Sequence, residues 1–280
     1  MPDDPLDRLV YLNRPGAKSA ERKSLEIGSD VEIADRVGED LRRAWGDVVH
    51  AEGEFWRYGE THWLVIPDHG LRCAVHDYDG AHFKTPTREP SRVKLSKGRV
   101  DSVLNEFAAK VAQPSFFENV TVGINCASGF IRFDRHGAPE LVVHHPDHRC
   151  RHTLPGRWSP ETGGVPPDGS LLGRLLGGVF RGDDDATAKV ELLAEIVGAA
   201  ALGYATKLRQ PRAVILKGET AENGKSQILD LARGLLPPSA ICSVTAGRMG
   251  DERHIIGLVG KLLNASDELS SADAIASETF

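Results

Sequence analysis

Residues 213–236 read AVILKGETAENGKSQILDLARGLL, and this stretch decides which fold the second half of the chain can adopt. Its Gly224-Lys225-Ser226 triplet has the ending of a phosphate-binding P-loop, whose usual pattern is G-x-x-x-x-G-K-[ST]. Five residues rather than four separate Gly218 from Gly224, so the loop is one residue longer than the pattern. The flanking residues must therefore show whether the triplet belongs to a nucleotide site or to an ordinary loop.

Both flanks of the triplet favour a nucleotide site. A P-loop needs a buried strand before it and a helix that begins at the lysine, because backbone N–H groups and the helix N-terminus together face the phosphates. Residues 213–216 are wholly apolar, which predicts a strand buried in a parallel sheet. Apolar residues at helical spacing predict a helix that continues to Leu235. In this setting Lys225 would neutralise phosphate charge and the Ser226 hydroxyl would bind Mg²⁺.

A second motif follows about 40 residues later, where an apolar run over residues 262–265 directly precedes Asp267 and Glu268. Acidic side chains at the tip of a strand beside the P-loop strand can hold Mg²⁺ through water and polarise an attacking water molecule. We expect Asp267 to hold the Mg²⁺ ion and Glu268 to polarise the attacking water molecule. The alternative is a solvated acidic pair that begins a helix.

Composition limits the remaining possibilities. The chain has 280 residues, 40% of them hydrophobic, which is enough for two globular domains. Its 34 basic and 40 acidic residues give a net charge of −6, so any contact with nucleic acid must come from a local patch. The four cysteines form no C-x-x-C pair, and no apolar run reaches about 18 residues. We expect a protein of a reducing cytoplasm that is neither secreted nor membrane-spanning.

Periodicity predicts a mixed α+β region before the P-loop. Helical spacing occurs over residues 30–45 and again over residues 100–111, and Ser29 with Glu32 forms a possible capping box. Further elements are expected as a hairpin turning at residues 59–61, strands within residues 120–125 and 129–145, and helices over residues 171–180 and 186–208. A Pro/Gly-rich piece over residues 155–169 predicts a domain boundary.

These residues resemble the phage and plasmid primase-helicases, whose ATPase is a superfamily 3 helicase. The resemblance lies in the Asn-Gly-Lys-Ser core at 223–226, in GKLLNASDELS at 260–270, and in HHPDHRCRHTLPGRWSP at 144–160. It extends to SDVEIADRVGEDLRRAW at 29–45 and VVHAEGEFWRYGETHWLVI at 48–66, which are similar to the domain between primase and helicase.

The resemblance implies an ATP-driven ring, usually a homo-hexamer, that works with a primase and translocates on single-stranded DNA in a bacterial host cell. It adds Asn223 to the nucleotide-binding residues and supports Glu268 as the Walker B carboxylate, while the longer loop puts the role of Gly218 in doubt. The implied organisation is a linker over 1–28, an accessory domain over 29–160, a helical linker over 161–210 and a P-loop, AAA+-like parallel-sheet ATPase domain over 211–280.

The ATPase part of this organisation is expected to be incomplete. Residues 213–280 supply about three strands, which would leave a parallel sheet with an open hydrophobic edge. No arginine follows Arg253, so none lies beyond the Walker B segment to act as an arginine finger. We therefore expect a truncated fragment with little ATPase activity of its own. Two other functions stay open, namely another P-loop NTPase or kinase, and a DNA- or partner-binding module without enzymatic activity.

Three further groups are weaker candidates. His144, His145, His148, Cys150 and His152 could suggest zinc, but no second ligand pair completes the set, so we favour a histidine-rich strand and loop. The segment over residues 84–99 has six basic residues and one acidic residue, so it could contact a DNA backbone. A solvated loop is the simpler interpretation. Trp56, Tyr58 and Trp63 could stack on bases, but we expect them to face a core.

Overall fold

The computed structural model describes residues 24–84, 91–160, 166, 169–203, 213–217 and 224–266. The chain divides into two compact units, the first ending at Phe117 and the second beginning at Glu118. This division falls inside the accessory domain expected over residues 29–160, and the other expected boundaries remain predictions. Both units contain helices and strands, so the predicted mixed α+β character is confirmed. Among the described residues, no helix combines the length and the apolar character that crossing a membrane requires.

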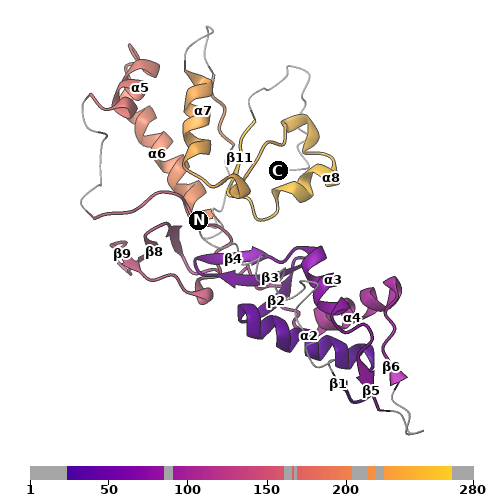
Figure 1. Ribbon diagram of the computed structural model, residues 1–280. Helices are drawn as coiled ribbons and strands as arrows, with labels where there is room; N and C mark the ends of the chain where they lie inside the picture. Colours follow the sequence, from indigo (N-terminus) through magenta and orange to yellow (C-terminus); the bar gives the residue numbers. More distant parts are fainter. Residues whose placement is uncertain are drawn as a thin grey trace. The chain divides into compact units, whose positions relative to one another are not determined.

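In its described residues the first unit combines three helices with short strands (Figure 1). Its described elements are β1 (Ser24–Leu25), α2 (Asp30–Trp45), β2 (Val48–Ala51), β3 (Glu54–Gly59), β4 (His62–Val65), α3 (Asp68–His76), β5 (His82–Phe83), β6 (Ser91–Arg92) and α4 (Lys97–Lys110). Strands β2, β3 and β4 form an antiparallel meander, and β1, β5 and β6 form a second sheet in which β1 runs parallel to β5. The predicted helices and the hairpin are therefore confirmed.

The start of α2 follows the predicted capping pattern with one difference. The Ser29 hydroxyl oxygen accepts the Glu32 backbone N–H at 3.2 Å, as a capping box requires. The Glu32 carboxylate, however, accepts the backbone N–H groups of Glu26, Ile27 and Gly28 at 2.6, 2.9 and 2.8 Å. Burial raises the pKa of Glu32, but these three hydrogen bonds outweigh it and leave the pKa below its usual value. The carboxylate thus fixes the chain between β1 and α2.

Helices α2 and α4 pack together over a well-filled core. Their apolar stripes meet where Gly38 of α2 faces the ring of Phe107, and a Cβ at Gly38 would lie 2.9 Å from that ring. Phe107 in turn stacks on Phe55 of β3, with ring centroids 5.1 Å apart. The side chains of this core that are at most 1% exposed are Ile33, Ala34, Val37, Ile66, Val75, Val93, Val100 and Val103. The two segments in which helical spacing was predicted, over residues 30–45 and 100–111, therefore form the centre of the first unit.

The second unit contains an antiparallel sheet, several helices and a parallel strand pair. Its described elements are β7 (Gly123–Cys126), β8 (Gly129–Phe133), β9 (Pro139–Val142), η1 (Pro146–His148), α5 (Leu171–Val179), α6 (Ala186–Leu202), α7 (Lys225–Gly234), η3 (Pro238–Ala240), β10 (Ile241–Cys242), η4 (Ala246–Arg248), α8 (Glu252–Ile255), η5 (Ile256–Leu258) and β11 (Leu263–Asn264). Strand β8 is central in the antiparallel sheet, and β10 pairs with β11 in parallel. The predicted strands after residue 120 and the helix predicted over residues 171–180 are present, and the helix predicted over residues 186–208 is confirmed up to Leu202, while residues 204–208 lie outside the described residues.

The strand predicted over residues 213–216 is not present in the structure. Residues 213–217 have no regular secondary structure, and Val214 and Ile215 are 50% and 65% exposed. A strand buried in a parallel sheet needs hydrogen-bonded neighbours and cover on both faces, and the described part of the chain gives this segment neither. The described partner of β11, the strand that precedes the expected acidic pair, is β10 and not this segment. In this region the described residues form one parallel strand pair, β10 with β11, and not the predicted P-loop parallel sheet.

Candidate functional site

The candidate site is built around the start of α7. Gly224 lies at the N-cap with φ 81° and ψ 5°, a left-handed conformation that an L-residue adopts only with strain. A Cβ at Gly224 would also lie 2.4 Å from the side chain of Val179, at the end of α5. Glycine is therefore required here for two independent reasons, which agrees with its place in the motif. Gly218 and Asn223 lie outside the described residues.

Lys225 and Ser226 occupy the first turn of α7, as predicted. The first helical hydrogen bond runs from the Ile228 N–H to the Gly224 carbonyl at 3.0 Å, so the N–H groups of the preceding turn have no partner within the helix. No side chain of the described residues caps this helix end. Lys225 is half-buried, Ser226 is exposed, and Ile228 is 5% exposed. The buried side chain of Ile228 therefore anchors the first turn of α7, while the polar groups of that turn stay accessible to an anion.

The expected acidic pair follows β11 after Ala265 and Ser266, and Asp267 and Glu268 themselves lie outside the described residues. Ala265, the residue after the strand, is 3% exposed, and its N–H donates to the Cys242 carbonyl at 2.9 Å. The chain is therefore held in the parallel pair almost up to the acidic residues. The strand expected over residues 262–265 is confirmed as the shorter β11.

Two side chains that sequence reasoning missed connect α7, β10 and the end of β11. Arg233, in the last turn of α7, donates to the Ala265 carbonyl at 2.9 Å and pairs with Asp230 at 3.3 Å. Asn264 of β11 accepts the Val244 N–H at 2.7 Å and donates to the Val244 carbonyl at 2.9 Å. These contacts set α7 and the chain after β10 against the strand that leads to the acidic pair. A basic residue near a helix C-terminus was the only available sequence signal for Arg233.

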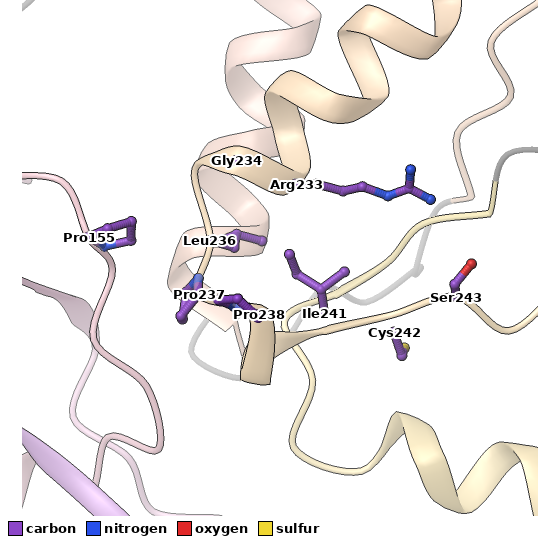
Figure 2. A pocket seen from close by; sticks show the side chains of 9 residues that line it. All are labelled: Pro155, Arg233, Gly234, Leu236, Pro237, Pro238, Ile241, Cys242 and Ser243. Carbon is purple, nitrogen blue, oxygen red and sulfur yellow. The ribbon is translucent and has the colours of Figure 1, made fainter. Parts of the chain in front are cut away.

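A cavity of about 650 Å³ lies at the other end of α7. Figure 2 shows Leu236, Pro238 and Ile241 gathered below the last turn of the helix, with Arg233 extending beside them. An α-helix of 10 residues is about 15 Å long. The cavity and Lys225 are thus at opposite ends of α7, and the cavity is no part of the expected phosphate site.

The His/Cys group does not gather into one place. His148 follows Asp147 in η1, and Arg149 after it has a φ of 54°, so the strand that would align the group is interrupted. Cys150 donates to the His148 carbonyl at 3.7 Å, and burial raises the pKa of its thiol to about 12. Within the described residues, no cluster of three or more His, Cys, Asp or Glu side chains could hold a metal ion. The group instead supplies structural contacts.

The most connected of these histidines is His152. Its Nε2 donates to the Gly260 carbonyl at 2.8 Å, and its Nδ1 accepts from the Ser239 hydroxyl at 3.1 Å. Burial lowers the pKa of His152, so the neutral ring that both contacts need is the stable form. On the other side, Asn125 of β7 donates to the His152 carbonyl at 2.9 Å. His152 therefore joins the antiparallel sheet to the turns that flank β10 and β11.

The aromatic side chains of the first hairpin belong to a core rather than to an open stacking surface. Trp63 is 4% exposed and packs edge-on against Phe116 at 4.8 Å between centroids. Trp56 and Tyr58 pack against the same cluster, and the Trp56 indole N–H donates to the Ala51 carbonyl at 3.0 Å. Their predicted place in a core is confirmed.

No protein-family model matches this sequence, and a comparison with curated proteins finds no match. The assignment of the site therefore depends on the residues and their geometry.

Proposed function

We propose that the second unit binds ATP and Mg²⁺ at the start of α7 and that the chain belongs to an ATP-driven DNA helicase of the superfamily 3 type. The observation that carries the proposal is the left-handed Gly224, which leads directly into α7 and sets Lys225 and Ser226 in its first turn. This is the local geometry by which a P-loop presents N–H groups, an ammonium group and a hydroxyl to phosphates.

The described residues fit such an anion. The first N–H groups of α7 have no partner within the helix, no described side chain caps them, and this end carries the positive end of the helix dipole. Lys225 would balance phosphate charge, and the Ser226 hydroxyl would be a ligand of Mg²⁺. ATP supplies the phosphoanhydride bond that is hydrolysed. Glu268 would orient and deprotonate the attacking water, and Asp267 would hold the metal through water.

The parallel pairing of β10 and β11 supports a link between the two motifs. Parallel strands need a crossover connection, and their carboxyl ends open at the same edge of a sheet. The Asp267-Glu268 pair follows the carboxyl end of β11, and the Arg233 contact with Ala265 ties α7 to that end. Single-stranded DNA, a homo-hexameric ring and a primase partner remain part of the proposal through the resemblance of the sequence.

The direct test is binding of a fluorescent ATP analogue, with and without Mg²⁺, to the 280-residue chain and to two variants. Lys225→Ala should weaken binding about tenfold to a hundredfold, because a charge-assisted hydrogen bond contributes about 1.5–3 kcal/mol. Gln227→Ala changes an exposed side chain in the same turn and should leave binding unchanged. Equal binding by wild type and Lys225→Ala would exclude the nucleotide site.

The helicase part is tested by ATP hydrolysis, measured with and without single-stranded DNA, and by the assembly state of the chain. Stimulation of hydrolysis by single-stranded DNA, together with formation of rings, supports the motor. Hydrolysis that needs a small phosphoryl acceptor and ignores DNA would replace it with a P-loop kinase.

A further inference from the structure

The β5–β6 ribbon of the first unit has two chemically different faces. Register places His82 opposite Arg92 and Phe83 opposite Ser91. Side chains alternate between the faces of a strand, so Ala81, Phe83 and Val93 share one face and His82, Arg92 and Lys94 share the other. Ala81 and Val93 are 3% and 1% exposed, which identifies their face as the inner one.

The outer face of this ribbon is basic. Arg92 and Lys94 are exposed on either side of the buried Val93, and the exposed Lys84 directly follows β5 on the side of His82. Within the described residues, none of Lys84, Arg92 and Lys94 has an ion-pair partner. We call Lys84, Arg92 and Lys94, with His82 between them, the basic ribbon face.

Neighbouring cations of the first unit are used differently. Arg99 pairs with Asp30 at 2.7 Å, and Arg72 pairs with both Asp68 and Asp101 at 2.7 Å. Through these ion pairs Arg99 links α4 to α2, and Arg72 links α3 to α4. The cations of the basic ribbon face, by contrast, have no ion-pair partner within the described residues. Because the chain as a whole has a net charge of −6, this face favours a local contact with a polyanion over general attraction.

The shape and chemistry of this face favour duplex DNA. Residues two apart on a strand are about 6.6 Å apart and paired strands are about 4.8 Å apart, so the cations form a compact array. Strand β5 lies between β1 and β6, so this face is part of a three-stranded sheet and can rest against the phosphates of a duplex. Single strands are usually held by aromatic side chains that stack on bases, whereas the ring of Phe83 packs on the core. Contacts from this face would thus go to phosphates.

We propose that the basic ribbon face binds the phosphate backbone of duplex DNA. The proposal deepens the helicase assignment and rests on its DNA-binding part, but it does not depend on ATP binding at α7. It assigns to the first unit a contact with the duplex, separate from the single strand on which the motor would translocate.

The test measures binding of a fluorescent 20-base-pair duplex and of a 20-nucleotide single strand to the 280-residue chain without nucleotide, over a range of salt concentrations. The test variant is Arg92→Gln with Lys94→Gln. The matched control is Arg42→Gln with Arg43→Gln, which removes the same charge from exposed side chains near the end of α2. Circular dichroism and thermal unfolding check that both variants fold like wild type. Lys225→Ala serves as a third variant.

The ribbon variant should bind the duplex about tenfold more weakly at low salt, and the slope of log K against log salt should fall by about 2. The control and Lys225→Ala should each stay within about twofold of wild type. Equal losses in the ribbon variant and the control would reduce the effect to net charge and overturn the proposal. Tighter wild-type binding to the single strand than to the duplex, with the same loss in the ribbon variant, would overturn the assignment to a duplex.

Discussion

Helices α2 and α4 of the first unit and helices α5 and α6 of the second show how much burial depends on an opposing surface. All four carry apolar residues at helical spacing, yet α2 and α4 contain fully buried side chains whereas α5 and α6 contain none in the described structure. Leu171 and Leu192 are 78% and 54% exposed. An apolar stripe therefore predicts a helix, but only a facing element determines whether that stripe forms a core.

Truncation of one buried and one exposed apolar residue should separate the two regions most strongly. Phe107→Ala removes a ring that is 2% exposed and stacked on Phe55, and it should cost the first unit about 3–5 kcal/mol. Leu192→Ala in α6 should change the free energy of unfolding by less than about 0.5 kcal/mol. Urea unfolding, followed for each unit by hydrogen exchange and mass spectrometry, measures both. Comparable losses would show that α6 is buried as well as α2 and α4.

The same contrast explains which predictions from sequence succeeded. The helix over residues 30–45 and the hairpin at residues 59–61 have local signals, namely the Ser29 cap and alternating aromatic residues, and both are present. The strand over residues 213–216 had only its apolar composition, which cannot specify neighbours, and it is not present. Arg233 and Asn264 bond backbone groups far along the chain, so no local pattern could indicate these partners, although Arg233 lies where a helix end favours a basic residue.

The candidate site gives the next prediction, because its geometry depends on one glycine. Gly224→Ala introduces a Cβ at a positive φ and against Val179, and it should cost about 1–3 kcal/mol in the second unit. Gly234→Ala is the matched control at the other end of α7, where a Cβ meets open space. That substitution should be neutral or stabilise by up to about 1 kcal/mol, since alanine is the better helix former.

Thermal unfolding of the two glycine variants, with hydrogen exchange in α7, checks this asymmetry. Equal stability of Gly224→Ala and wild type would mean that the left-handed N-cap is not required. The phosphate site would then lose its main structural support, because other residues could form the same turn.

The smallest expected effect is the pH dependence of the second unit. Burial lowers the pKa of His152 below the ordinary histidine value of 6.5, and the pKa values of His144 and His148 are lowered for the same reason. Below pH 6.5 the unfolded chain therefore binds protons that the folded unit resists, so stability is complete above this pH and falls as the pH drops toward the folded pKa values. A single group can contribute at most about 1.4 kcal/mol for each pH unit.

His152→Gln tests whether the contact between the sheet and the strand pair causes this dependence. At pH 7.5 the variant should lose some stability, because the hydrogen bonds to Ser239 and Gly260 are altered. Between pH 7.5 and 5.5 it should lose less further stability than wild type, because one of the three titrating rings is gone. Hydrogen exchange in β10 and β11 at both pH values is the measurement, with the first unit of the same molecule as the internal reference. An unchanged pH dependence in the variant would place the titration at His144 and His148, so the link through His152 would be structural without responding to protons.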